Sequence, residues 1–340
     1  MTAMASGVLL RVEDLQMHFP GRRGSGGPVR AVDGVGLDVH HGETLGLVGE
    51  SGCGKSTLGR AIARAYRPTS GRLRYRRTDG GEVDLAALGE RALRPYRQEI
   101  RMIFQDPFSS LNPRMTLRDI VGEPLKVNRV ARGRALQERV AQLLTMVGLR
   151  PEHMSRYPHA FSGGQRQRVA IARALALRPR LVIADEAVSA LDVSVQAQIL
   201  NLLARLRAEL DLTTLFISHD LSVVRQLCDR VAVMYLGRVV EVAPTDELFA
   251  RPRHPYTEAL LSAVPADHPS RRGGRDRIVL EGDLPDPSDP PPGCPFHTRC
   301  PYAASRCATE PPPAVEVEPG RTVACHLADE LDLRGAGQAA

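Results

Sequence analysis

Hydrophobic residues along the chain follow two alternating patterns. Short continuous apolar runs, such as 43–49 (ETLGLVG), 181–186 (LVIADE) and 215–220 (LFISHD), have the length and composition of buried strands. Stretches such as 56–66 (STLGRAIARAY) instead have the spacing of helices. The alternation continues to about Arg251, and it predicts an α/β fold with a largely parallel central sheet.

The pattern changes in the last quarter of the chain. Residues 254–264 (HPYTEALLSAV) have helical spacing, whereas residues 284–293 (LPDPSDPPPG) are rich in proline and charge. The second stretch is too poor in apolar residues to form a core, so we expect a linker or an extended segment lying on the surface. We therefore predict a main domain over residues 1–262 and a C-terminal extension over residues 263–340. No internal repeat is present, which indicates one copy of the main domain.

A glycine-rich sequence follows the first of these apolar runs directly. It fits the phosphate-loop pattern GxxxxGK[ST] at every fixed position and comprises Gly49, Glu50, Ser51, Gly52, Cys53, Gly54, Lys55, Ser56 and Thr57. Its glycines let the backbone turn around phosphate oxygens and aim N–H groups at them. Lys55 supplies positive charge for the β- and γ-phosphates, Ser56 offers a hydroxyl to Mg²⁺, and Thr57 begins a helix whose positive end faces the anion. Because a strand precedes the loop and a helix follows it, nucleoside triphosphate binding is favoured over a chance glycine pattern.

Length and charge narrow the classes of protein. A chain of 340 residues can bury a large core, and it contains no apolar run long enough to span a bilayer. The first residues lack the features of a signal peptide, so we expect a cytoplasmic location. The net charge of +6 is modest and spread out, and we interpret the arginine-rich stretches at 72–77 and 271–277 as solvated surface rather than nucleic-acid sites.

A second candidate anion site follows at residues 161–173 (FSGGQRQRVAIAR). Ser162, Gly163 and Gly164 precede a strongly helical run, and free N–H groups at a helix start attract anions. Here the sequence resembles the ATP-binding cassette (ABC) ATPases, whose signature LSGGQ ends at the position of Gln165. The departure from that signature is Phe161 in place of leucine, and the position stays apolar.

The resemblance implies roles for residues elsewhere in the chain. Asp185 and Glu186 match the Walker B element, in which the first carboxylate holds Mg²⁺ and the second acts as general base. Gln105 matches the Q-loop glutamine, which senses Mg²⁺ and touches the membrane partner. His219 matches the switch histidine that contacts the γ-phosphate. Ala187 stands where these ATPases commonly have proline, and we expect hydrolysis to survive because the carboxylates are intact.

Two further assignments follow from the same resemblance. Residues 189–192 (SALD) match the D-loop, which communicates across a dimer interface. Phe19 lies where the family often stacks an aromatic ring on adenine, with neighbouring His18 as the competing candidate. The family fold has a RecA-like core, an antiparallel β subdomain and a helical subdomain. Two subunits share each ATP, so the signature acts in trans and ATP closes the dimer.

The C-terminal residues resemble one group within this family. Residues 254–265 and 280–303 are similar to the C-terminal extension of the oligopeptide and dipeptide importer ATPases, and residues 157–168 and 188–203 are closer to the second (F-type) of their two paired ATPases. The resemblance implies an ATPase that powers peptide import from the cytoplasmic face of the membrane. Its implied partners are a second cassette subunit, two membrane-spanning permeases and, indirectly, an extracytoplasmic peptide-binding protein.

Alternative functions remain open on the sequence. They are a soluble single-cassette ATPase, an exporter ATPase, a non-catalytic scaffold, and a subunit that serves nickel or a peptide-like solute. The single cassette, the importer-like C-terminus and the intact catalytic residues favour the peptide importer.

Four of the six cysteines are concentrated near the C-terminus, at Cys294, Cys300, Cys307 and Cys325. In a reducing cytoplasm this concentration favours a metal over disulfides, although the CxxC spacing usual for structural zinc is absent. The resemblance to importer ATPases implies a four-iron, four-sulfur cluster, while zinc and free thiols stay open. His297 and His326 are alternative ligands. We interpret Cys53 and Cys228 as structural.

Overall fold

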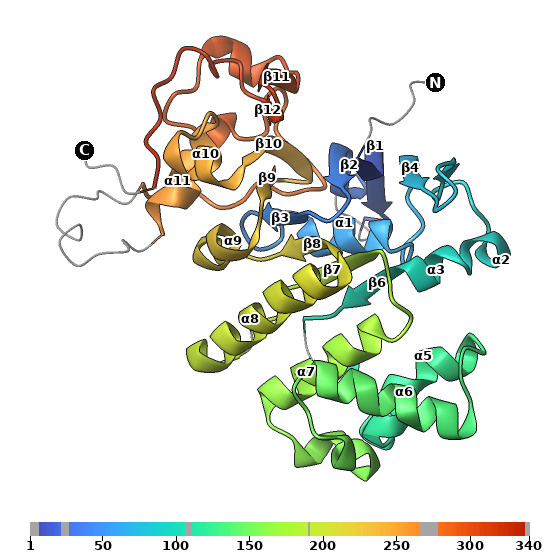
Figure 1. Cartoon of the computed structure of the whole chain (residues 1–340). Coiled ribbons are helices and arrows are strands. Elements are labelled where there is room, and N and C mark those ends of the chain that lie inside the picture. Colours follow the sequence, from blue (N-terminus) through green and yellow to red (C-terminus); the bar gives the residue numbers. More distant parts are fainter. Residues whose placement is uncertain (1–6, 22–26, 106–109, 190, 265–277, 337–340) are drawn as a thin grey trace. The chain divides into compact units, whose positions relative to one another are not determined.

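The computed structural model describes residues 7–21, 27–105, 110–189, 191–264 and 278–336. The chain divides into two compact units, of which the first comprises Met1–Ala87 with Ser218–Ala340 and the second comprises Leu88–Ile217 (Figure 1). Several residues included in the ranges above lie outside the described residues: Ala190 of the D-loop, Pro265, and the stretch 271–277.

An antiparallel sheet with strand order β2-β1-β4-β5 forms one part of the first unit. Its strands are β1 (Val8–Phe19), β2 (Val29–His40), β4 (Ser70–Arg76) and β5 (Glu82–Asp84). Side chains such as Leu10, Val12 and Leu15 are buried, while intervening positions are polar. This sheet corresponds to the antiparallel β subdomain that the resemblance implied.

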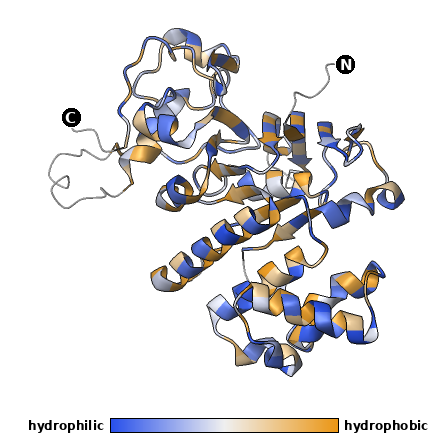
Figure 2. Cartoon of the chain, viewed as in Figure 1, coloured by the Kyte–Doolittle hydropathy of each residue, from blue (hydrophilic) through white to orange (hydrophobic). Residues whose placement is uncertain are grey.

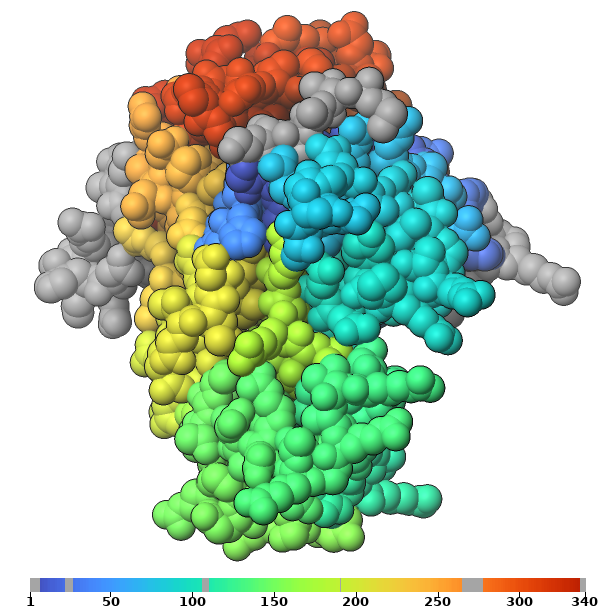
Figure 3. All heavy atoms as spheres, turned by 45° about the vertical axis from the view of Figure 1, so that its right-hand side comes forward, coloured from blue at the N-terminus to red at the C-terminus, as the bar shows by residue number. Residues whose placement is uncertain are grey.

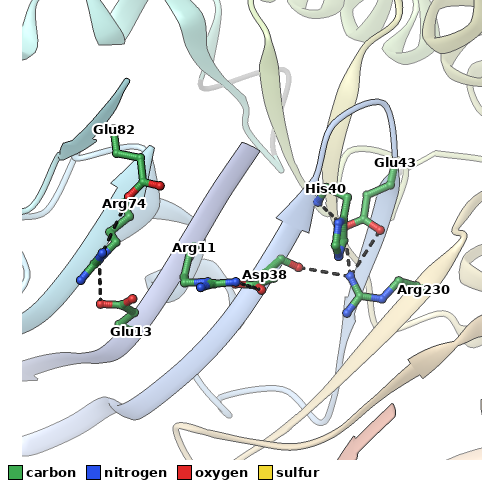
Figure 4. A network of polar contacts seen from close by, with 8 residues as sticks. All are labelled: Arg11, Glu13, Asp38, His40, Glu43, Arg74, Glu82 and Arg230. Atoms are coloured by element: carbon green, nitrogen blue, oxygen red, sulfur yellow. Dashed lines mark hydrogen bonds and ion pairs between the residues drawn. The ribbon is translucent and has the colours of Figure 1, made fainter. Parts of the chain in front are cut away.

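Charged side chains cross this sheet and reach the neighbouring strand β9 (Arg230–Tyr235) (Figure 4). Arg11 lies opposite Asp38 in register, and their side chains pair at 2.8 Å. Arg74 pairs with Glu13 at 3.0 Å, and Arg230 donates to the main-chain oxygen of Asp38. The network also includes His40, Glu43 and Glu82. Opposite charges at facing positions stabilise the strand register.

The first unit also contains strands in the order β3-β9-β10-β12-β11. The parallel pair is β3 (Thr44–Val48) with β9, and antiparallel partners follow in β10 (Arg238–Pro244), β12 (Arg321–Val323) and β11 (Val315–Glu318). Its helices are α1 (Lys55–Ile62), α9 (Leu221–Leu227), α10 (Thr245–Ala250) and α11 (Pro255–Ser262), with 3₁₀ turns η4 (His297–Arg299) and η5 (Ser305–Ala308). Every residue of β3 is buried, which is typical of a central parallel strand.

The second unit combines parallel strands with helices. Strand order is β8-β7-β6, formed by β8 (Thr213–Ile217), β7 (Leu181–Asp185) and β6 (Ile100–Ile103). The helices are α2 (Glu90–Leu93), α3 (Tyr96–Glu99), α5 (Leu117–Val127), α6 (Gly133–Met146), α7 (Gly163–Leu175) and α8 (Val193–Leu210), with 3₁₀ turns η1 (Pro151–Ser155) and η2 (Pro158–Ala160). Hydrophilic and hydrophobic positions alternate along α8 (Figure 2), and its buried face includes Ile199, Leu202 and Leu206.

The α/β fold predicted from the alternating pattern is confirmed. Parallel pairing joins β3 to β9 and also β6, β7 and β8, and the helices α5, α6 and α7 pack together as a helical subdomain. Among the described helices, none has the combination of length and apolar character needed to cross a bilayer.

The C-terminal residues extend the structure of the first unit rather than forming a separate core. They lie beside the segment that carries α10 and α11 in both views (red and orange in Figures 1 and 3), because β12 pairs with β10. The proline-rich stretch 284–293 forms no helix or strand and turns at Asp286–Asp289, and Pro287 accepts a hydrogen bond from the N–H of Arg30 at 3.0 Å. Between these two strands, Arg321 of β12 forms a fully buried ion pair with Glu241 of β10 at 2.8 Å.

Burial of His254 gives this region a pH dependence. His254 caps α11 through Nδ1, which accepts the N–H of Tyr256 at 3.0 Å, and desolvation lowers the pKa of His254 to about 3. The unfolded chain, with a pKa near 6.5, therefore binds the proton more tightly. The stability that neutral His254 contributes is complete above about pH 6.5 and is lost as the pH falls toward 3.

We predict a pH effect that a His254→Asn variant lacks, since asparagine keeps a capping oxygen and does not titrate. Between about pH 6.5 and 5, the free energy of unfolding of the wild type should fall by up to about 1.4 kcal/mol per pH unit more than that of the variant. Urea unfolding of both proteins at several pH values measures this difference. Parallel pH dependences would contradict the assignment of neutral His254.

Candidate nucleotide site

The phosphate loop lies in the first unit between β3 and α1. Two of its glycines are required by backbone geometry: Gly49 has φ +150°, and a Cβ there would meet the main-chain oxygen of Met234 at 2.1 Å. Gly54 has φ +105°, and a Cβ would lie 2.0 Å from the main-chain oxygen of Ala31. The loop therefore has the conformation that glycine alone accommodates without strain.

Lys55 holds this loop closed from within. Its ammonium group donates to the main-chain oxygens of Gly49 and Glu50, each at 2.8 Å, and its side chain is buried. Gly54 caps α1 without any side-chain hydrogen bond, which leaves the helix start uncovered by a capping side chain. Ser51 and Gly52 are exposed, whereas Ser56 and Thr57 are half-buried. A buried cation at the start of a helix, within a glycine cradle, suits a polyphosphate.

The side chain of Cys53 is also buried within the loop. Burial raises the pKa of the Cys53 thiol, and the main-chain oxygen of this residue accepts the N–H of Gly237 at 2.9 Å. These contacts agree with the structural interpretation of Cys53. Cys228 is also buried, at the end of α9.

His219 is exposed and lies in the first unit, two positions before α9 begins. The preceding residue, Ser218, donates its N–H to the main-chain oxygen of Leu47 in β3 at 3.2 Å. The following residue, Asp220, caps α9 by accepting the N–H of Ser222 at 2.9 Å. Both neighbours of His219 are thus anchored, and the first unit holds the histidine loop against the strand that leads into the phosphate loop.

The two candidates for adenine stacking occupy adjacent positions at the end of β1. Phe19 is half-buried and meets Tyr66 edge to face, with ring centroids 5.7 Å apart. His18 is engaged by Asp33, with 3.5 Å between Nε2 and the carboxylate. The engagement of His18 favours Phe19 as the stacking residue.

In the second unit, the carboxylate pair follows strand β7. Asp185 is the last residue of that strand and is fully buried. Glu186 has a left-handed backbone with φ +46°, and its N–H donates to the main-chain oxygen of Ile217 at 3.0 Å. Such backbone strain in a non-glycine residue is concentrated at functional sites.

The structure brings Gln105 and Glu186 together, although 81 positions separate them in the chain. The amide nitrogen of Gln105 donates to a carboxylate oxygen of Glu186 at 2.7 Å. Ser189 of the D-loop donates through its hydroxyl to the main-chain oxygen of Glu186 at 3.1 Å. Three predicted elements of the site, the Q-loop, Walker B and D-loop, therefore meet at Glu186. Ala187 is buried beside them.

The signature residues form the start of α7. Ser162 and Gln165 make a reciprocal capping box: the Ser162 hydroxyl accepts the N–H of Gln165, and the Gln165 side chain accepts the N–H of Ser162. A Cβ on Gly164 would lie 2.3 Å from Val195 of α8, so glycine permits close packing there. Phe161 is buried and contacts the ring of His153. The N–H groups of Gly163 and Gly164 take no part in this capping box, which preserves them as candidate anion donors.

Three residues predicted to bind Mg²⁺ carry oxygen atoms. Ser56, Gln105 and Asp185 offer hydroxyl, amide and carboxylate oxygens, which are hard ligands of the kind that Mg²⁺ selects. Ser56 belongs to the first unit and the other two belong to the second.

The predicted iron–sulfur cluster is wrong. All four cysteines, Cys294, Cys300, Cys307 and Cys325, are described, and each is a free cysteine. Among the described residues, no group of three or more His, Cys, Asp or Glu side chains is arranged to hold a metal ion, which also removes the zinc alternative.

The environment of these sulfurs explains the error. Burial raises the pKa of Cys300 to about 12 and that of Cys325 to about 11, which favours thiols over the thiolates that bind metals. The alternative ligands His297 and His326 each pair with a main-chain oxygen, at 2.8 and 2.9 Å. The cysteine spacing alone therefore misled the prediction.

Comparisons with known proteins agree with the fold and the motifs. Residues 32–189 match the ABC transporter family, and residues 240–307 match the oligopeptide/dipeptide transporter C-terminal region. The chain belongs to the ABC transporter family and is an ATPase of that family.

Individual relatives are similar over nearly the whole chain. The oligopeptide transport ATP-binding protein AppF of Bacillus subtilis is 52% identical, with 96% of this chain and 99% of AppF covered. The probable peptide ABC transporter ATP-binding protein y4tS of Sinorhizobium fredii is 54% identical, with 95% of this chain and 90% of y4tS covered. The dimeric ATP-binding cassette MJ0796, bound to ADP and Pi, has a TM-score of 0.62 at 29% identity and covers 70% of this chain and 99% of its own.

The sequence interpretation missed residues that support the site from a distance. Tyr256 accepts the N–H of Glu50 through its hydroxyl at 2.7 Å, and Arg299 pairs with the Glu50 carboxylate at 2.8 Å. Tyr256 belongs to the sequence 254–264 (HPYTEALLSAV), but nothing in that sequence indicates that its hydroxyl contacts the phosphate loop.

Proposed function

We propose that the chain is the ATP-hydrolysing subunit of a peptide importer, bound peripherally at the cytoplasmic face of the membrane. The observation that carries this proposal is the presence, in one chain, of a complete set of cassette motifs and a C-terminal region of the oligopeptide/dipeptide transporter type. Relatives named for oligopeptide and peptide transport support it. We further propose that the cassette spans residues 1–262 and the extension residues 263–340.

In the proposed site, the phosphate loop binds the triphosphate. Main-chain N–H groups of the loop Gly49–Thr57, other than those of Glu50 and Cys53, which bond within the protein, face phosphate oxygens, and Lys55 balances their negative charge. Phe19 stacks on the base. Ser56, Gln105 and Asp185 would hold Mg²⁺, which when bound neutralises charge on the phosphates.

Proposed catalysis depends on Glu186 as general base for the attacking water. Its carboxylate accepts a proton, while the 2.7 Å hydrogen bond from Gln105 orients it. His219 contacts the γ-phosphate, and hydrogen bonds of the residues on either side, Ser218 and Asp220, hold its backbone in place. Orientation of the base and the phosphate in this way lowers the entropy cost of hydrolysis.

We propose that a second cassette subunit completes the site. Ser162, Gly163, Gly164 and Gln165 would then face ATP held by the partner subunit, with the capping box keeping the helix start rigid. The similar cassette MJ0796 is a dimer in its ADP- and Pi-bound structure, which supports this arrangement. The proposed assembly is a heterodimer with two transmembrane permeases and an extracytoplasmic peptide-binding protein, without nucleic acid.

Measurement of ATP turnover in two settings tests the proposed function. The purified chain alone should hydrolyse ATP slowly, because each site lacks the partner's signature residues. Reconstitution in vesicles with a second cassette, two permeases and a peptide-binding protein should raise turnover, and added peptide should raise it further. A Lys55→Met variant serves as the control for hydrolysis by this chain. Full turnover alone, unaffected by permeases and peptide, would contradict the proposal.

A further inference from the structure

Glu50, in the phosphate loop, is held by residues near the C-terminus of the chain. The Arg299 guanidinium makes two parallel contacts with the Glu50 carboxylate, at 2.8 and 3.2 Å. The two residues lie 249 positions apart and belong to the same compact unit. The Arg299 side chain is 7% exposed and that of Glu50 is 30% exposed, so the contact is only weakly screened by solvent.

A second contact fixes the backbone of the same residue. The N–H of Glu50 donates to the hydroxyl of Tyr256 at 2.7 Å, and its main-chain oxygen accepts from Lys55 at 2.8 Å. Glu50 is thus bound through its N–H, its carbonyl and its carboxylate. Because Lys55 is itself attached to Glu50, a movement of Glu50 would displace the ammonium group that the proposed site assigns to the phosphates.

Aromatic rings pack around the residues that contact Glu50. The ring of Tyr256 packs against Tyr235 and Phe296, with centroids 4.7 and 5.4 Å away. Phe296 is buried and immediately precedes the η4 turn that carries Arg299. The Tyr256 hydroxyl thus belongs to a packed cluster of aromatic rings, and Arg299 follows a residue of that cluster by three positions.

The negative charge of Glu50 would affect the affinity of the loop for ATP. A carboxylate in a phosphate-binding loop repels the triphosphate, and bidentate pairing with Arg299 offsets that charge. Hydrogen bonding to Glu50 also raises the pKa of Arg299, so the guanidinium is charged at every relevant pH.

We propose that Arg299 and Tyr256 are positioning residues for ATP: residues from the segment 240–307, which matches the oligopeptide/dipeptide transporter C-terminal region, orient Glu50 of the phosphate loop and neutralise its charge. Nucleotide affinity of the cassette then depends on a segment that lies outside the matched cassette residues 32–189. This inference rests on ATP binding by the phosphate loop, but it requires neither peptide as the transported solute nor any particular partner.

Equilibrium binding of a fluorescent ATP analogue to the purified full-length chain tests this inference. Arg299→Gln should raise the Kd by about tenfold, because the Glu50 carboxylate loses its counter-charge beside the phosphates. The double variant Glu50→Gln/Arg299→Gln should return the Kd to within about twofold of the wild type, since the unpaired carboxylate is gone. The Kd of Arg299→Lys should lie between that of the wild type and that of Arg299→Gln, because lysine keeps the charge without the bidentate geometry.

A matched control and a second variant make the result decisive. Arg134→Gln removes an exposed arginine that pairs with Glu138 on a helix of the second unit, and its Kd should match the wild type. Tyr256→Phe should raise the Kd without a change in charge, because the N–H of Glu50 loses its acceptor. An unchanged Kd in Arg299→Gln, or a double variant as weak as the single variant, would overturn the inference. Absence of ATP binding by the wild type would instead overturn the proposed nucleotide site.

Discussion

Replacement of Glu186 by glutamine is expected to lower the kcat for ATP hydrolysis by about 10²–10⁴-fold, because the amide does not accept the proton of the attacking water. ATP binding should survive, since the phosphate loop and Lys55 are unchanged. The geometry is also preserved: glutamine is isosteric, and the N–H of residue 186 still donates to the main-chain oxygen of Ile217. We expect ATP to accumulate on the variant and to hold a closed dimer.

Two measurements check this expectation: phosphate release at saturating ATP, and the mass of the protein in solution with and without ATP. Glu209→Gln, which replaces an exposed glutamate on α8, is the matched control and should hydrolyse ATP as the wild type does. Normal turnover by Glu186→Gln would exclude Glu186 as the general base.

Replacement of Arg321 by methionine is expected to lower the free energy of unfolding by about 3–5 kcal/mol. The ion pair between Arg321 and Glu241 is fully buried, and its removal leaves a buried carboxylate without its cation. The main-chain N–H groups of Arg253 and His254 still donate to Glu241, each at 3.0 Å, but they carry no net charge. Arg321 also donates to the main-chain oxygen of Arg251, and this contact is lost with it.

Denaturant unfolding of the purified chain measures this effect as a shift in midpoint. The double variant Arg321→Met/Glu241→Gln should regain a large part of the lost stability, because no uncompensated charge stays buried. Arg97→Met breaks an exposed pair with Glu90 and should change stability by less than about 1 kcal/mol. If Arg321→Met and Arg97→Met lowered the free energy of unfolding equally, the buried ion pair would contribute no more to stability than the exposed one.

Much of the fold was predictable because hydrophobic spacing reports local structure. The apolar runs at 43–49, 181–186 and 215–220 contain β3, β7 and β8, and the helical run after the phosphate loop contains α1. The predicted C-terminal extension proved harder to interpret. Its strand β12 pairs with β10, about 80 positions away in the chain. The spacing of hydrophobic residues does not indicate which distant strands pair.

The cysteines show why composition can mislead. Their concentration predicted a metal, yet the preference of a sulfur for metal depends on its protonation and on where its neighbours point. In the folded chain, burial raises the pKa of Cys294, Cys300 and Cys325, and no described group of ligands converges on a metal.

By itself, the sequence determined the α/β class and the phosphate loop, because Gly49, Gly54 and Lys55 act within one short stretch of backbone. The tertiary structure decided which distant side chains share a site. Gln105 reaches Glu186, and Arg299 reaches Glu50, through packing between segments that are 81 and 249 positions apart. A motif of contiguous residues can be recognised from the sequence, because its chemistry depends on neighbouring positions. Contacts between residues 81 or 249 positions apart form only when buried strands and aromatic clusters pack the segments together.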